Sequence, residues 1–320
     1  MSKLGAYSIR KVKCMRMWRV KNQINCTADV QNKYSGKNIS VAILDTGIFF
    51  HPDFSDRILA FNDFVNHQQH PYDDSGHGTH VAGCLAGNGS LSNGKYSGIA
   101  PSCNLIIGKI LDKNGDGKIR NMLEAIQWIS DYKDKYNIRI LNISIGFEEN
   151  VTETKVQKLI TILEELFNQN ILIVVAAGNK GPNAKTISPL GLSNKILTVG
   201  CHDLDYTKNG VTLCETYSGR GPTSFSLKKP DIVAPGTNII STSFLCRKSG
   251  NHYIHGYQGK SGTSFATPLV SGAAALLFEK NENLNAQEVK HRLCYTATDL
   301  KEPWNKQGWG MLNVKRALEI

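Results

Sequence analysis

Four polar residues that stand far apart in the chain each lie in a short phrase containing glycine. They are Asp45 in LDTGI, His77 in SGHGTH, Asn179 in AAGNKG and Ser264 in SGTSFA. A serine hydroxyl becomes a nucleophile at neutral pH when a neutral imidazole accepts its proton and a carboxylate orients that imidazole. Donors aimed at the developing oxyanion complete such a site, and the Asn179 amide and the Ser264 N–H are of this type.

Each of these residues also has an ordinary structural explanation. Ser264 opens an apolar helical pattern, where serine commonly caps a helix by accepting bonds from backbone N–H groups. Asp45 is typical of a turn after a strand, His77 of a helix start and Asn179 of a loop. The combination of all four phrases, rather than any one of them, indicates nucleophilic catalysis.

The segments around these phrases alternate between strand-like and helix-like apolar patterns. Continuous apolar runs predict buried strands at Ile39–Asp45, Asn104–Leu111, Ile138–Gly146, Ile171–Asn179 and Lys195–Gly200. Helical spacing predicts helices from His77 to about Gly87 and over 119–135, 154–169, 264–280 and 285–295, with a turn-rich stretch over 201–260. This order predicts an α/β fold with a mainly parallel central sheet and helices on both faces. Asp45, Gly146 and Asn179 are then expected at the carboxyl edge of the sheet, where chemistry gathers.

Seven phrases together resemble those of the subtilisin-like serine peptidases. AILDTGI resembles the Asp motif of that family, HGTHVAG its His motif and GTSFATPLVSG its Ser motif, while GIAP, SIG, AAGN and KPDIVAPG resemble further family phrases. The resemblance covers about residues 38–318. It implies a three-layer subtilisin-like fold and a serine endopeptidase that works through an acyl-enzyme.

The resemblance also implies a role for individual residues. Asp45 orients His77, His77 is the general base, Ser264 attacks the substrate and Asn179 stabilises the oxyanion. Ser144 and Gly146 pair with the substrate backbone as an added strand. The positions implied to contact substrate are Ser144, Ile145, Gly146, Ala177 and Gly178. The chemistry requires no metal or other cofactor.

The sequence departs from the family pattern at several positions. Phe265 follows the nucleophile where the family usually has methionine. Asp53 matches a position that often ligates calcium in the family, but the stretch 87–96 gives no clear match to the remaining ligands, so a structural calcium is doubtful. Ser188-Pro189 is the candidate for the cis proline that the family often has near its substrate pocket. About 37 residues precede the first core strand, and the usual inhibitory pro-domain is not recognisable among them.

Positive charge is concentrated at the N-terminus. Residues 1–37 hold nine Lys or Arg and one acid, Asp29, so they carry eight of the ten net positive charges of the 320-residue chain. We expect a basic N-terminal extension over 1–37, chiefly solvated, and a peptidase domain over 38–320. The extension could touch acidic lipid, nucleic acid or an acidic partner, whereas the nearly neutral body argues against a nucleic-acid-binding protein.

No run of apolar residues is long enough for a transmembrane helix or a secretory signal. We therefore expect a cytoplasmic protein, or a secreted one if a signal was removed. The eight cysteines include no C-x-x-C pair, so reduced thiols are favoured over a disulfide framework or a zinc site. His80 and Cys84 are predicted to be packed residues of the His77 helix. Asp73 and Asp74 either favour the start of that helix or attract a basic substrate side chain.

The sequence thus predicts a serine endopeptidase acting on proteins or peptides. General turnover of intracellular protein and processing of a precursor such as a peptide leader both stay open. The main alternative is a catalytically silent subtilisin fold that serves as a binding scaffold.

Overall fold

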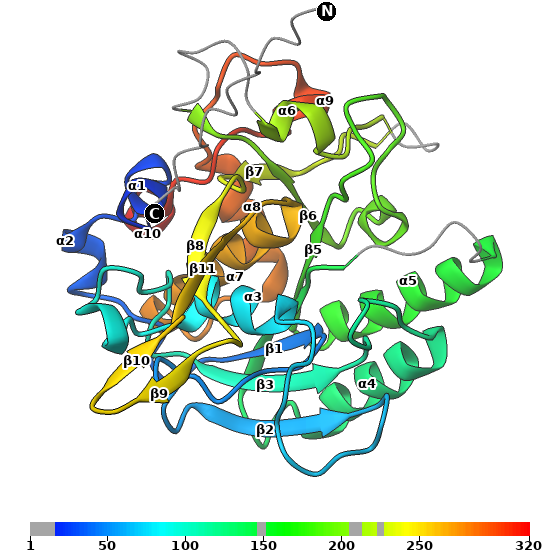
Figure 1. The fold of residues 1–320 in the computed structure, drawn as a ribbon. Coiled ribbons are helices and arrows are strands. Elements are labelled where there is room, and N and C mark those ends of the chain that lie inside the picture. The colour runs from blue at the N-terminus through cyan, green and yellow to red at the C-terminus, as the bar shows by residue number, and fades with distance from the viewer. Residues whose placement is uncertain (1–16, 146–151, 205–212, 223–226) are drawn as a thin grey trace, which may run out of the picture.

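The computed structural model describes residues 17–145, 152–204, 213–222 and 227–320 (Figure 1). A seven-stranded sheet lies at its centre, and all of its neighbouring strands run parallel. In spatial order the strands are β2 (Ile58–Asp63), β3 (Asn104–Lys109), β1 (Ser40–Asp45), β4 (Ile138–Ile143), β5 (Leu172–Ala176), β6 (Leu197–Cys201) and β7 (Ile232–Ala234). Two antiparallel pairs lie outside it: β8 (Ile239–Thr242) with β11 (Tyr257–Lys260), and β9 (Arg247–Ser249) with β10 (His252–Ile254).

The helices of the described residues range from four to eighteen residues in length. They are α1 (Met17–Gln23), α2 (Ala28–Gln31), α3 (His77–Ala86), α4 (Ile119–Tyr132), α5 (Glu153–Asn168), α6 (Leu213–Tyr217), α7 (Thr263–Lys280), α8 (Ala286–Tyr295), α9 (Trp304–Gln307) and α10 (Val314–Glu319). None of these helices is both long enough and apolar enough to cross a membrane.

Helices cover both faces of the large sheet. Asn142 of β4 hydrogen-bonds to Ser271 of α7, so α7 packs on the face to which Asn142 points. Gly108 of β3 faces Ala125 of α4. Gly108 is level with Ile143, the residue of β4 that follows Asn142, because both pair with Leu44 of β1. Because successive residues of a strand point to opposite faces, α7 and α4 lie on opposite sides of the sheet. The predicted three-layer α/β fold is confirmed.

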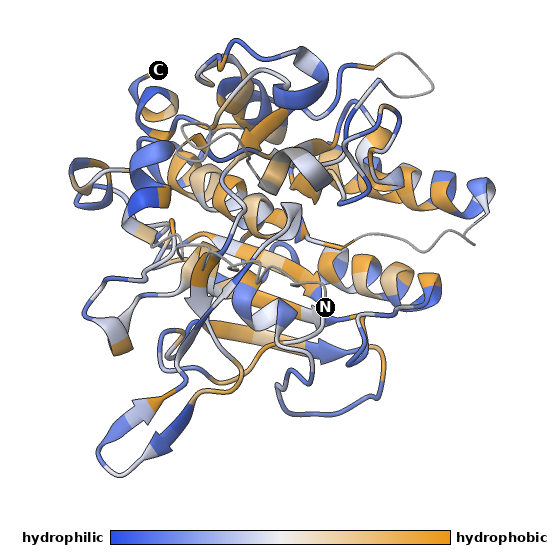
Figure 2. Ribbon diagram, turned by 45° about the horizontal axis from the view of Figure 1, so that its top comes forward, coloured by the Kyte–Doolittle hydropathy of each residue, from blue (hydrophilic) through white to orange (hydrophobic). Residues whose placement is uncertain are grey.

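The hydrophobic core lies between these layers. Every residue of β1 is buried, as is every residue of β5 and β6, which agrees with strands that are covered on both faces. Figure 2 shows hydrophobic residues in the central strands and central helices, while the outlying β9–β10 hairpin is largely hydrophilic.

Helix α7 runs through the middle of the molecule (Figure 1). All of its residues from Thr263 to Phe278 are buried, with one exception, Ser264, which is half-buried. A helix that is apolar on all sides is stable only in such an interior position. The fold therefore encloses the helix and leaves Ser264, in its first turn, within reach of a ligand.

The predicted strands and helices are present with small shifts of their ends, and the prediction missed other elements. Strand β2 is mostly half-exposed and β7 is three residues long, so neither has a strong apolar run. The stretch 201–260, predicted only as turns, also contains α6 and the four strands β8 to β11.

Two further expectations are wrong for the residues that the structure describes. Part of the basic N-terminal segment is not solvated, because Met17 and Val20 of α1 are buried in the core and Val314 of α10 donates its N–H to Ile24 O. The bond before Pro189 is not cis, whereas those before Pro182, Pro222 and Pro230 are.

Candidate active site

Asp45 and His77 form a hydrogen-bonded acid–imidazole pair. Asp45 is the last residue of β1 and His77 the first of α3, and 2.7 Å separates Asp45 Oδ1 from His77 Nδ1. The Asp45 side chain is fully buried, whereas a quarter (25%) of the His77 side chain is exposed. Because Nδ1 faces the carboxylate, Nε2 is the ring nitrogen left to accept a proton. The structure thus brings Asp45 and His77 into the contact that an orienting carboxylate and a general base require.

Charged neighbours from several elements set the basicity of His77. Burial lowers the pKa of His77, but the charge and hydrogen bond of Asp45 raise it more, and the net shift is upward. Lys260 on β11 opposes this increase, and Asp73 adds to it. The imidazole is therefore a stronger base than an isolated histidine.

Asp73 fixes the start of α3. Its Oδ2 accepts hydrogen bonds from the Thr79 N–H (2.9 Å) and hydroxyl (2.6 Å), and its Oδ1 accepts from Gly76 N (2.7 Å) and the Thr46 hydroxyl (2.9 Å). Asp73 thus satisfies backbone N–H groups at the helix N-terminus. Asp74 pairs with the buried Lys109 amine at 2.7 Å. The structure supports the helix-start alternative for Asp73, whereas Asp74 forms an ion pair that neither alternative predicted.

A glycine allows β1 and α3 to approach closely. A Cβ at Gly78 would lie 2.2 Å from Gly47 O and 3.2 Å from Asp45 Oδ1. Any side chain at this position would push His77 away from its carboxylate. The glycine of the HGTH phrase is therefore a requirement of the Asp45–His77 distance.

Ser264 lies in the first turn of α7, where backbone N–H groups have no acceptor within the helix. The neighbouring Phe265 ring packs against both His77 (centroids 5.3 Å apart) and His80 (4.6 Å). The start of α7 thus lies against the start of α3. Among the described residues, none is hydrogen-bonded to the Ser264 hydroxyl; catalytic hydrogen bonds often form only when substrate is bound.

Asn179 is attached to the same turn of α7. Its Oδ1 accepts hydrogen bonds from the Thr263 N–H and from the Thr263 hydroxyl, both at 3.0 Å. This anchoring leaves the Nδ2 donor of Asn179 for another partner. The structure therefore brings Asn179 next to Ser264, as predicted.

The predicted substrate-contacting positions differ in their environments. The Ser144 side chain is buried and accepts a hydrogen bond from Asn142 Nδ2 at 2.8 Å, while Ile145 is half-buried. Ala177 is buried, and its N–H and C=O are bonded to Val199 and Ser188. The Gly178 carbonyl oxygen accepts a hydrogen bond from Gly219 N. Gly146 lies outside the described residues.

His80 and Cys84 are packed residues, as predicted. His80 Nε2 lies 3.0 Å from Ile239 O and 3.1 Å from Gln258 O, and burial lowers the pKa of His80 to about 3. The neutral ring therefore ties α3 to β8 and β11. Cys84 is fully buried, and burial raises the pKa of its thiol to about 12, which makes it unreactive.

The prediction of reduced thiols throughout is wrong for one pair. Cys201 and Cys214 form a disulfide with Cα atoms 5.6 Å apart, a separation that suits this bond. The other described cysteines are free: Cys26, Cys84, Cys103, Cys246 and Cys294. Cys14 lies outside the described residues. Nothing in the spacing of Cys201 and Cys214 indicated the pair, because the fold brings β6 and α6 together.

Asp53, the candidate calcium ligand, is surrounded by hydrogen-bond donors. Its carboxylate accepts from the Tyr257 hydroxyl, the Ser90 hydroxyl and the N–H groups of Gly89 and Leu91, at 2.9 to 3.3 Å. Donors of this kind take the place of a cation rather than accompany one. Calcium here stays a prediction of the resemblance that these contacts do not favour.

The sequence interpretation missed Lys260. Its amine donates to Gly76 O at 2.9 Å, one residue before His77, and β11 brings it there from four residues before Ser264. A single lysine before the Ser motif does not indicate in the sequence that its amine will reach Gly76.

Comparisons with known proteins place the chain in a family. The model of the subtilase family matches residues 36–310. Serine protease AprX of Bacillus subtilis is 39% identical over 300 residues, covering 89% of this chain and 67% of that protein. Subtilisin of Bacillus pumilus is 33% identical over 305 residues, covering 93% of this chain and 97% of that protein. The crystal structure of a cold adapted subtilisin-like serine proteinase has a TM-score of 0.68 at 24% identity, covering 88% of this chain and 90% of that one.

The chain therefore belongs to the subtilase family and is a subtilisin-like serine peptidase. Its substrates are accordingly proteins or peptides.

Proposed function

We propose that Ser264, His77, Asp45 and Asn179 carry out peptide-bond hydrolysis through an acyl-enzyme. The observation that carries the proposal is the 2.7 Å contact between the buried Asp45 carboxylate and His77, at the point where α3 meets the start of α7. His77 Nε2 takes the Ser264 proton as the hydroxyl attacks the substrate carbonyl, and Asp45 stabilises the imidazolium that forms.

Two donors are available to the developing oxyanion. Asn179 Nδ2 is left free of the bonds that hold its carbonyl oxygen on Thr263, and the Ser264 N–H belongs to the open first turn of α7. His77 then returns the proton to the leaving amine, and water hydrolyses the acyl-enzyme by the reverse use of the same groups. The substrate backbone adds as a strand beside residues 144–146.

We further propose that the enzyme acts inside the cell, either in general protein turnover or in processing a precursor. Five described cysteines are unpaired and buried, against one disulfide pair, which suits a reducing compartment better than an oxidising one. Contact between the basic N-terminal segment and an acidic partner stays a proposal. Lys21 of that segment takes no part in it, because it is buried and bonds to Ser97 and Gln31.

A fluorophosphonate probe tests the catalytic proposal, with the adduct located by mass spectrometry. We expect an adduct on Ser264 in the parent protein and none in Ser264→Ala. Asp45→Asn should label more slowly by about three orders of magnitude or more, because the imidazole loses its orienting carboxylate. A folded parent protein that takes no label would support the silent scaffold, in which the fold only binds.

A further inference from the structure

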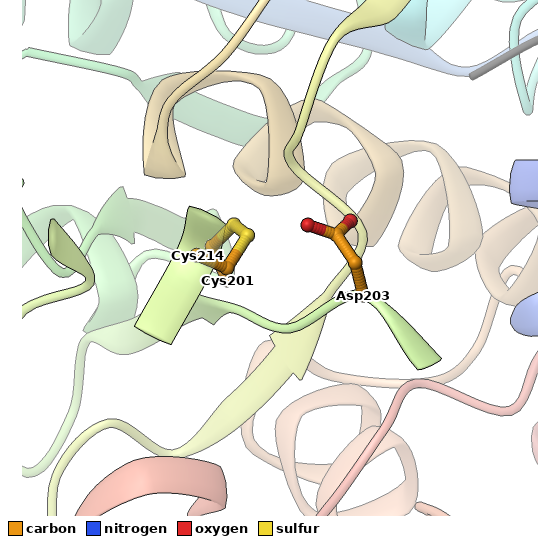
Figure 3. A group of neighbouring side chains, drawn as sticks. All are labelled: Cys201, Asp203 and Cys214. Atoms are coloured by element: carbon orange, nitrogen blue, oxygen red, sulfur yellow. A yellow bond between two sulfur atoms is a disulfide. The ribbon is translucent and has the colours of Figure 1, made fainter. Parts of the chain in front are cut away.

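Three buried side chains gather in one cluster: Cys201, Asp203 and Cys214 (Figure 3). Cys201 is the last residue of β6, at the carboxyl edge of the sheet, and Cys214 lies in α6. One ligand atom from each residue lies within 4.8 Å of the others, and the two sulfurs are bonded to each other. The catalytic proposal does not use this cluster.

Asp203 binds the loop that follows β7. Its Oδ1 accepts hydrogen bonds from Gly236 N (3.1 Å) and Thr237 N (3.3 Å), while its Oδ2 is buried without a partner. Burial raises the pKa of this carboxyl group. Asp203 thus fixes Gly236 directly beside the disulfide.

Gly236 connects the disulfide to the start of α7. Its carbonyl accepts hydrogen bonds from Gly262 N (2.9 Å), which precedes α7, and from the Tyr217 hydroxyl (3.3 Å). The Tyr217 hydroxyl also lies 3.4 Å from each sulfur. A Cβ at Gly236 would lie 2.5 Å from Cys201 Sγ and 2.8 Å from Gly262 O. There is consequently no free space between the disulfide and the turn that carries Ser264.

The segment around Asn179 is hydrogen-bonded to the C-terminal end of α6, where Tyr217 lies, and to Gly219 just beyond it. Tyr217 O accepts a hydrogen bond from Gly181 N, and Gly219 N donates one to Gly178 O, both at 2.8 Å. These bonds hold the chain on both sides of Asn179. The disulfide ties α6, which carries Tyr217, to the end of β6. One covalent bond therefore supports the nucleophile and the oxyanion donor together.

We propose that Cys201 and Cys214 are a reversible thiol–disulfide modification site that sets the positions of Ser264 and Asn179. The inference rests on the catalytic roles proposed above for these two residues. The disulfide form holds Gly236 and Tyr217 in place and is the active form. The dithiol form loosens both supports and is slower.

The disulfide form becomes the dithiol form by thiol–disulfide exchange with a dithiol reductant. A reductant thiolate attacks Sγ of Cys201, the less buried residue at 4% exposure against none for Cys214, and Cys214 leaves as a thiolate that takes up a proton. The second thiol of the reductant, after losing its proton, then forms the reductant's own disulfide and releases Cys201. Two electrons pass to the pair, and a small disulfide such as oxidised glutathione reverses the change.

A metal ion is the competing occupant of this cluster. Two thiolates and a carboxylate are ligands that zinc accepts, and a carboxylate oxygen of Asp203 lies within 4.8 Å of the sulfurs. The bond between the sulfurs favours the disulfide, because bonded sulfurs are not available as thiolate ligands. Zinc binding by the reduced pair is therefore a separate outcome of the test.

The test compares oxidised and dithiothreitol-treated protein under native conditions. Alkylation and mass spectrometry count the thiols, and hydrolysis of a peptide substrate gives kcat and KM. We expect reduction to expose Cys201 and Cys214 and to lower kcat by about tenfold with little change in KM, because a small misplacement of catalytic groups slows the chemical step. The double variant Cys201→Ser/Cys214→Ser should match the reduced protein in both buffers. Cys246→Ser, which removes a buried free thiol on the β8–β9 loop, should keep the response.

Three results would overturn the proposal. The bond could resist reduction in folded protein, the double variant could be as active as the oxidised parent, or kcat could be the same in both states. A fourth would replace it: reduced protein takes up one equivalent of zinc, activity follows zinc loading, and Asp203→Asn abolishes the uptake. Labelling of Ser264 separates the two proposals, because oxidised protein that takes no label contradicts the catalytic proposal itself.

Discussion

Replacing Asp73 by asparagine should destabilise the start of α3 and slow catalysis. Each oxygen of the Asp73 carboxylate accepts at least two hydrogen bonds, and the side chain is 6% exposed. Asparagine has the same size, but its NH₂ group must replace one of these oxygens. The amide then faces a backbone N–H, from Thr79 or Gly76, that loses its acceptor.

The structure gives the size of the effect. One charge-assisted hydrogen bond is lost and the remaining ones are weakened, which together costs about 3 kcal/mol of unfolding free energy. For 320 residues at about 2.1 cal/mol/K each, this corresponds to a fall in Tm of about 4 °C. Calorimetry should use a Ser264→Ala background, which prevents self-cleavage, with Asp56→Asn at an exposed position as the control.

The pH dependence identifies the cause of this loss. Burial raises the pKa of Asp73, but the bonds from Thr79 and Gly76 lower it more, so the net shift is downward. A carboxylate of this kind stabilises the fold above its unfolded pKa of about 3.9, and the stabilisation disappears as pH falls through the lower folded-state pKa. The difference in Tm should be complete at pH 7 and shrink below about pH 4. A difference under about 1 °C at pH 7, or one that does not shrink in acid, would refute the reasoning.

Two other predictions concern the surroundings of His77. Lys260→Met should move the acidic limb of the kcat/KM profile to higher pH, because the Lys260 charge lowers the pKa of His77, which must be neutral to act as a base. Lys260→Arg keeps the charge and should leave the limb in place. Equal profiles for all three proteins would contradict this. The parent enzyme, oxidised at Cys201 and Cys214, should keep its activity in mild peroxide, because Phe265 beside the nucleophile has no sulfur to oxidise. Phe265→Met should lose activity there, and the prediction fails if the two proteins lose activity at the same rate.

The residues proposed as catalytic can be located in the sequence because the local requirements of each position are visible within a few residues of it. Asp45 follows a continuous apolar run, and the parallel sheet needs such runs at its centre. Gly78 is beside His77 because nothing larger fits against Asp45. Ser264 lies in the first turn of α7, which is buried from Phe265 to Phe278 and whose apolar composition is equally plain. In each case the signal lies within a few residues of the site.

The remaining features depend on contacts between distant segments. The approach of Lys260 to Gly76 depends on the pairing of β8 with β11, two short strands inside a stretch that looks like turns. The segment that follows α1 is held by α10, at the other end of the chain, because Val314 N donates to Ile24 O. No local periodicity encodes such contacts, so a sequence pattern could not distinguish a packed basic segment from a solvated one.

The position of the Cys201–Asp203–Cys214 cluster depends both on local sequence signals and on contacts between distant segments. Cys201 occupies on β6 the place that Asp45 occupies on β1, the last residue of a strand at the carboxyl edge of the sheet. Parallel strands bring all such residues to one edge, so a reactive group at the end of a strand lies on the same edge of the sheet as the proposed catalytic residues. The position of Cys201 at the end of a strand does not by itself link it to Ser264 or Asn179. Gly236 provides the link to the turn before Ser264, and Tyr217 provides the link to the segment that carries Asn179. A change at the Cys201–Cys214 bond should therefore alter kcat even though neither cysteine is among the proposed catalytic residues.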